Sequence, residues 1–159
     1  MATSLLKGWL DDRAQPFCWI DYEAYARHVF AGDAADWYRD PARHAATLMQ
    51  ARGVLPTQVI AVDVAAPFVE LADGREPAAL VAALGAATPR AFVGDVLNAL
   101  LHRFAGKVDV VLKIQAPWDL LGGADAEPDF DALDDVATAL AACMRELADR
   151  PLAGLLVET

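Results

Sequence analysis

Three short apolar runs recur along the chain, and segments with helical spacing separate them. The runs are QVIAVDVA at 58–65, VDVVLKIQ at 108–115 and LAGLLVE at 152–158. The first two are rich in β-branched residues, which favour strands, and strands of nearly continuous apolar sequence are typical of a parallel sheet covered by helices. This alternation predicts an α/β fold in which parallel strands alternate with helices.

Helices are expected wherever apolar residues recur three and four positions apart between helix start and stop signals. The predicted helical segments are 21–32, 39–53, 77–87, 91–106 and 131–150. In the best-defined segment Asp40 can cap the helix, Pro41 takes the first position and Gly53 ends it. One face of the first segment gathers Tyr22, Tyr25, Ala26 and Val29. We expect a single α/β domain over 1–159, with a helical N-terminal part at 1–56 and β/α units at 57–159.

Charge and composition exclude several classes of partner. The formal net charge is −10, with 13 basic and 23 acidic residues, so the clustered cations that nucleic-acid phosphates require are missing. The same balance disfavours a membrane surface, and no apolar run approaches the roughly 20 residues of a membrane-spanning helix. Cys18 and Cys143 lie far apart without metal-ligand spacing and are expected to be reduced thiols. A cytoplasmic protein is therefore predicted.

Each predicted strand has one apolar face and one face that becomes polar toward its C-terminal end, because side chains alternate with a period of two. The apolar faces comprise Ile60, Val62 and Val64, then Val108, Val110, Leu112 and Ile114, then Ala153, Leu155 and Val157. The polar groups on the opposite faces are Asp63, Lys113, Gln115 and Glu158. If the strands are parallel, these polar groups meet at one edge of the sheet.

Two architectures fit this pattern. One is a partial (β/α) barrel, whose active-site groups lie at the C-terminal ends of the strands, and the other is a small open α/β sheet. A third interpretation assigns no function, because Lys113 can form a structural ion pair with Asp63 or Glu158. An unpaired charge in a dry interior costs several kcal/mol, so the buried groups must meet one another, a ligand or water.

The segment KIQAPWDLLGG at 113–123 places a proline turn directly after a strand. Together with the aspartate-bearing strand VIAVDVAAPFVE and the order of the following helices, it resembles the superfamily of uroporphyrinogen decarboxylase and cobalamin-independent methionine synthase. The resemblance covers about 50–159 and implies a (β/α)₈ barrel. Such a barrel typically needs about 250 residues, so this chain would correspond to its N-terminal half. Self-association or a second chain would then complete the barrel.

The resemblance implies an enzyme acting on a small carboxylate-bearing metabolite, by decarboxylation or, as rival chemistry, by methyl transfer. Asp63 would stabilise positive charge as carbon dioxide leaves, and Lys113 would neutralise a substrate carboxylate. Gln115, Trp118 and Glu158 would bind the substrate.

No metal or other cofactor is expected, because the three histidines lie in predicted helices without ligand spacing. Of these, His44 is interpreted as a solvated or capping residue. The alternative function is a non-catalytic module that docks a partner protein through its acidic surface and aromatic N-terminal part. Five aromatic residues gather there, and core packing is their ordinary explanation: Trp19, Tyr22, Tyr25, Trp37 and Tyr38.

Overall fold

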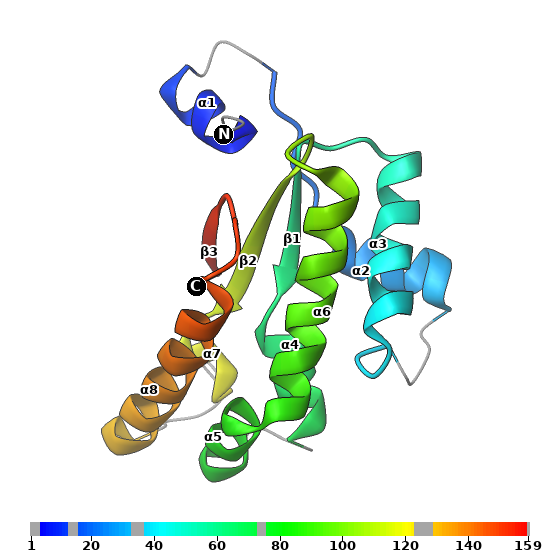
Figure 1. The fold of residues 1–159 in the computed structure, drawn as a ribbon. Coiled ribbons are helices and arrows are strands. Elements are labelled where there is room, and N and C mark those ends of the chain that lie inside the picture. Colours follow the sequence, from blue (N-terminus) through cyan, green and yellow to red (C-terminus); the bar gives the residue numbers. More distant parts are fainter. Residues whose placement is uncertain (1–3, 13–15, 33–36, 73–75, 123–128, 159) are drawn as a thin grey trace.

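A computed structural model of the chain describes residues 4–12, 16–32, 37–72, 76–122 and 129–158. Its centre is a sheet of three parallel strands, β1 (Val59–Asp63), β2 (Asp109–Gln115) and β3 (Gly154–Glu158), in the order β1-β2-β3. The fold is α/β with a small open sheet (Figure 1). Of the two predicted architectures, this is the open one.

Nine helical elements occur among the described residues. They are α1 (Leu5–Asp11), α2 (Tyr22–Ala26), the π-helix η1 (Arg27–Ala31), α3 (Pro41–Val54), α4 (Ala65–Leu71), α5 (Pro77–Gly85), α6 (Ala87–Phe104), α7 (Pro117–Leu120) and α8 (Phe130–Leu147). Among these, no single helix is long and apolar enough to cross a membrane. Taken together, α5 and α6 reach the required length and composition, but they are bent by 58° relative to each other.

Four of the five predicted helical segments correspond to α3, α5, α6 and α8, and the fifth, 21–32, is divided between α2 and η1. The segment through Pro67 is part of α4. Pro67 is the third residue of that helix, where a backbone N–H has no partner within the helix and its loss costs little.

The predicted apolar face of 21–32 is wrong at its C-terminal end. Tyr22 and Ala26 are buried, whereas Val29 is 52% exposed. The reason is the π-helix η1, whose wider turn changes the direction of the side chains that follow α2. Gly32, with a φ of 64°, then ends the element in the left-handed conformation.

The main core lies on the side of the sheet that faces α6 and its neighbours. Ile60, Val62, Val110, Leu112 and Ile114 pack there against buried residues of the helices, as the alternation of side chains predicts for the first two strands. Figure 1 shows α6 running along β1 and β2, with α3 beyond it.

The third strand departs from the prediction. Leu155 and Val157 lie opposite Leu112 and Ile114 in the register of β2 and β3, so they face the same side of the sheet. They are nevertheless 52% and 50% exposed. The reason is that α8 makes its main packing contact with α5, and the helical layer among the described residues does not cover β3.

The opposite side of the sheet is covered near the N-terminal ends of the strands. Val59, Ala61 and Val111 form a small cluster with Leu6 and Trp19 among their neighbours. The Asp109 carboxylate holds α1 in place, because its Oδ2 accepts hydrogen bonds from the Leu6 N–H at 2.6 Å and from the Ser4 hydroxyl at 2.7 Å. This cover leaves the C-terminal ends of the strands for the polar groups.

Candidate functional site

A lysine surrounded by carboxylates occupies the C-terminal edge of the sheet. Lys113 Nζ lies 3.0 Å from Asp21 Oδ2 and 3.5 Å from both Asp63 Oδ2 and Glu158 Oε2. The structure therefore brings together three of the residues singled out in the sequence, Asp63, Lys113 and Glu158. It adds Asp21, which the sequence did not indicate.

The position of each group follows from the parallel register. Asp63 pairs with Lys113 across β1 and β2, and Gln115 pairs with Glu158 across β2 and β3. Asp21 reaches the cluster from the segment before β1, where its other carboxylate oxygen caps α2 by accepting the Glu23 N–H at 3.1 Å. Side chains from three strands and one helix start thus converge on one ammonium group.

Asp63 also has a structural task. Its Oδ1 accepts hydrogen bonds from the N–H groups of Ala65 and Ala66 at 2.8 and 2.9 Å, which caps the first turn of α4. Its Oδ2 faces Lys113. Both oxygens are therefore engaged, and the side chain is held in one orientation.

The charges around Lys113 keep its ammonium group protonated. Burial by itself lowers the pKa of Lys113, because desolvation disfavours the charged form. The hydrogen bond to Asp21 and the negative charges of Asp63, Asp21 and Glu158 outweigh this effect, so the pKa lies above the ordinary lysine value. At neutral pH the cluster is one buried cation among three carboxylates.

A cavity of about 380 Å³ adjoins this cluster. Its size suits a small polar molecule. The lining residues come from the C-terminal ends of β1 and β2, from the start of α2 and η1, and from the segment before α3: Asp21, Glu23, Ala24, Arg27, Tyr38, Asp63 and Lys113.

Glu23 is the least expected group in this lining. It is only 7% exposed, and its Oε2 accepts the backbone N–H of Asp63 at 3.0 Å. Burial, and after it the charge of Asp63, raises the pKa of Glu23 to about 8, although hydrogen bonds from the Asp63 backbone and the Tyr38 hydroxyl act in the opposite direction. Glu23 is therefore a neutral carboxylic acid at pH 7.

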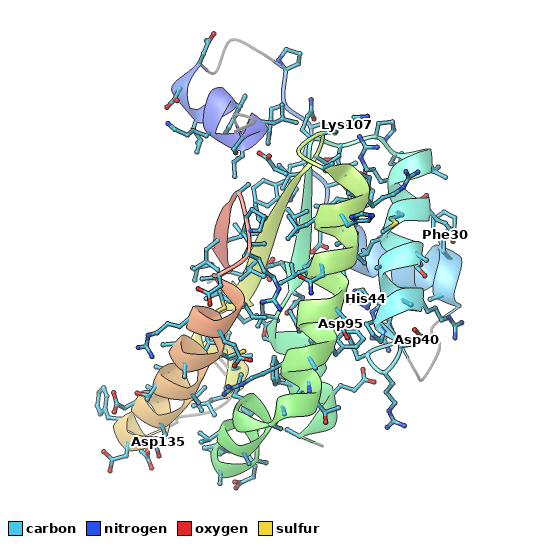
Figure 2. The ribbon with its side chains drawn as sticks, viewed as in Figure 1. Phe30, Asp40, His44, Asp95, Lys107 and Asp135 are labelled. Carbon is cyan, nitrogen blue, oxygen red and sulfur yellow. The ribbon has the colours of Figure 1, made fainter. Side chains whose placement is uncertain are left out.

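His44 lies directly behind Glu23. Figure 2 shows His44 on the side of α3 that faces α6, and its ring lies 4.2 Å from the Trp37 ring and 5.4 Å from the Phe92 ring between centroids. Its Nε2 is 3.6 Å from Glu23 Oε1, and its Nδ1 is 3.4 Å from the Trp37 carbonyl oxygen. Burial lowers the pKa of His44 to about 4, so the imidazole is neutral at pH 7.

The interpretation of His44 as a solvated or capping residue is wrong, since it is 1% exposed. A sequence signal was available, because His44 lies four residues before Leu48 and seven before Ala51, which are both buried on the same face of α3. Glu23 likewise lies three residues before the buried Ala26.

Arg27 completes the lining with a second cation. Its guanidinium lies 5.5 Å from the centre of the Tyr38 ring, and its Nη2 lies 4.0 Å from Glu70 Oε2. Its Nε is buried and has no hydrogen-bond partner among the described residues. Burial is also the main cause that raises the pKa of Tyr38, so the Tyr38 hydroxyl stays protonated.

Two of the predicted substrate-binding residues lie outside this lining. Gln115 is half-buried beside Glu158, at the end of β2. Trp118 is 41% exposed on α7. Because Pro117 starts α7 immediately after β2, this aromatic side chain is carried out of the cavity lining. The glycine at 123, which ends the quoted motif, lies outside the described residues.

The cavity therefore combines two cations, a neutral acid and fixed carboxylates. Neither Cys18 nor Cys143 forms a disulfide, and within 4–12, 16–32, 37–72, 76–122 and 129–158 no three or more His, Cys, Asp and Glu side chains are arranged to hold a metal ion. The arrangement suits acid–base and electrostatic chemistry on a small ligand.

Comparisons of the chain with family models, with curated proteins and with solved structures gave no match. The resemblance to the uroporphyrinogen decarboxylase and methionine synthase superfamily therefore rests on the sequence pattern, and its function stays a prediction.

Proposed function

We propose that the protein is a cytoplasmic enzyme that acts on a small carboxylate-bearing metabolite in the cavity beside Lys113. The observation that carries this proposal is the presence of two cationic side chains, Arg27 and Lys113, in the lining of one cavity. A carboxylate suits a guanidinium because its two oxygens match the planar donor geometry.

The two cations have different tasks in this proposal. Lys113 is already compensated by Asp21, Asp63 and Glu158, so it holds these carboxylates in place beside the ligand. Arg27, whose Nη2 lies 4.0 Å from Glu70 Oε2, is the group that binds the ligand carboxylate. The sequence interpretation gave this binding task to Lys113.

Decarboxylation fits the cavity better than methyl transfer. In decarboxylation the bond between the carboxyl carbon and its neighbour breaks, carbon dioxide leaves, and a proton takes its place on carbon. Once a solvent proton has been added to the substrate carbon, Asp63 and Asp21 can stabilise the resulting positive charge until carbon dioxide leaves. Methyl transfer would need a methyl donor as a second substrate in the same 380 Å³.

Replacing Arg27 with Met is expected to weaken the binding of malonate about tenfold or more, because a charge-assisted hydrogen bond contributes about 1.5–3 kcal/mol. Malonate is the probe and malonamide its uncharged control, with binding followed by isothermal titration calorimetry. Arg103→Met, at an exposed position near the end of α6, is the matched variant and should bind like the parent protein. Equal malonate affinity in the Arg27 variant and the parent would refute the proposal.

A specific observation favours a second candidate function, self-association through β3. The two edges of the sheet differ. At the β1 edge, the Glu23 carboxyl group accepts the Asp63 N–H and the Cys18 carbonyl oxygen accepts the Gln58 N–H. At the other edge, β3 pairs only with β2 among the described residues. Exposed Leu155 and Val157 lie on this free edge strand. A second copy of the chain is the occupant that we propose, since two such strands can pair around a two-fold axis.

The Val157→Lys variant is expected to convert a dimer into a monomer, because a charge on an edge strand opposes pairing between strands. Light scattering after size-exclusion chromatography measures the mass directly. Val29→Lys, at an equally exposed valine on η1, should leave the dimer intact. A parent protein that is monomeric at high concentration would eliminate this candidate.

A further inference from the structure

We propose that the cavity takes up a carboxylate together with one proton, and that Glu23, backed by His44, is the residue that holds this proton. The inference rests on the proposed function, because it concerns the same cavity and the same class of ligand. It makes ligand binding dependent on proton uptake above neutral pH.

The geometry requires a proton between the two residues. His44 Nδ1 faces the Trp37 carbonyl oxygen, which can only accept, so Nδ1 carries the hydrogen and Nε2 presents a lone pair. Glu23 Oε1 is 3.6 Å from that Nε2, and each of these two buried atoms lacks a hydrogen-bond partner among the described residues. If Glu23 were ionised, two acceptors would face each other in a dry interior. A hydrogen on Oε1 removes the repulsion between these two acceptors.

The other carboxyl oxygen of Glu23 already accepts a hydrogen bond. Glu23 Oε2 accepts the Asp63 backbone N–H, which fixes the carboxyl group between β1 and α3. The proton is therefore expected on Oε1, the oxygen that lies toward His44. His44 acts through Glu23 and is a positioning residue.

The charges that face Glu23 determine how ligand binding changes its protonation. These groups come from every element packed around it: Asp21 at the start of α2, Arg27 on η1, Tyr38 before α3, His44 on α3, Asp63 on β1 and Lys113 on β2. Asp63 favours the protonated form of Glu23, and Lys113 favours the ionised form. A ligand carboxylate on Arg27 would bring one more negative charge into the lining. The bound ligand would therefore stabilise the protonated form of Glu23.

The test is calorimetric titration of the protein with malonate between pH 7 and 9.5, in two buffers of different ionisation enthalpy at each pH. The dissociation constant is expected to rise about tenfold for each pH unit above about 8, with close to one proton taken up per malonate at pH 9. In the Glu23→Gln variant, the amide mimics the protonated acid, so malonate should bind without proton uptake and with a nearly constant affinity.

Carboxyl carbon NMR of the ligand-free protein measures the same proton independently. The Glu23 signal, identified by its absence in Glu23→Gln, is expected to titrate near pH 8. The His44→Phe variant keeps an aromatic ring among Trp37 and Phe92 but removes Nε2, and it should lower this midpoint. The His44→Gln variant restores a hydrogen-bond acceptor, so it should raise the midpoint of the Glu23 titration again.

The outcomes separate this inference from the proposed function. Malonate binding with no proton uptake, or a Glu23 signal that titrates near pH 4.5, would overturn the inference and leave the proposed function standing. Absence of malonate binding at every pH would overturn both. Binding with proton uptake that persists in Glu23→Gln would show that another group holds the proton, and would also overturn it.

Discussion

The Glu23→Gln variant is expected to be about 4–5 kcal/mol more stable than the parent protein at pH 8.5. Glu23 is ionised in the unfolded chain above its ordinary value of 4.5, whereas in the folded protein its pKa is raised to about 8. Over this interval the folded state binds one more proton than the unfolded state, so the free energy of unfolding falls by about 1.36 kcal/mol per pH unit. Gln cannot ionise, and its amide can keep both neighbours of Glu23: its oxygen accepts the Asp63 N–H, and its N–H donates to His44.

The gain should depend on pH in a specific way. It should be close to zero well below pH 4.5, where Glu23 is protonated in both states, and it should grow up to about pH 8. His44 has the opposite effect on the free energy of unfolding. Its pKa is lowered to about 4 in the folded protein, whereas in the unfolded chain the imidazole is protonated up to about pH 6.5. Below pH 6.5 the two contributions nearly cancel in the parent protein. Above pH 6.5, only Glu23 continues to lower the free energy of unfolding as the pH rises.

Urea denaturation at several pH values measures this difference. Glu70→Gln is the matched control, because Glu70 is partly exposed and its Oε2 lies 4.0 Å from Arg27 Nη2, so that solvent screens this interaction. It should change stability little at any pH. A Glu23→Gln variant whose stability parallels that of the parent at all pH values would mean that Glu23 is already ionised in the folded protein.

The second large effect is expected at Lys113. Replacement with Met should destabilise the protein by about 3 kcal/mol at pH 7, because it leaves the buried Asp63 carboxylate without its cation, beside Asp21 and Glu158. The loss should become smaller at acid pH, where carboxyl groups take up protons. It should also be reduced when the Asp63→Asn substitution is made in the same chain, since the amide removes the buried charge while its oxygen can still cap α4.

Chemical denaturation of the two single variants and the double variant gives the coupling between these side chains. Lys7→Met provides the control, because Lys7 forms an ion pair with Asp11 on α1 at the same 3.0 Å but is 67% exposed. Such exposed pairs contribute little. If Lys113→Met proved no more harmful than Lys7→Met, the carboxylates around Lys113 would have to be satisfied by water.

Much of the strand layer could be predicted from the sequence. The alternation of side chains in β1 and β2 identified which residues face the helices, because a period of two leaves no other arrangement once one face is buried. The same alternation, together with parallel strands, identified Asp63, Lys113 and Glu158 as neighbours. The rule failed for Leu155 and Val157, because burial of a strand face depends on whether a helix packs over it, and strand periodicity carries no information on that.

The N-terminal part of the site could not be predicted in this way. Asp21, Glu23, Arg27 and Tyr38 lie well before β1 in the chain, and local spacing does not specify which strand end they reach. The π-helix at 27–31 also changes the direction of its side chains in a way that α-helical spacing does not anticipate. Trp118 was misplaced for a related reason, since the orientation of a short helix after a strand is decided by packing.

The sequence by itself determined the α/β class, the polar ends of the strands and the identity of the lysine at their centre, because these follow from backbone geometry and the avoidance of unpaired buried charge. Only the tertiary structure decided that Glu23 and His44 face each other. The protonation of Glu23 is set by desolvation and by the charges of Asp63 and Lys113, and that of His44 is set mainly by desolvation. These effects arise from distances between groups far apart in the chain, and such distances exist only once the chain has folded.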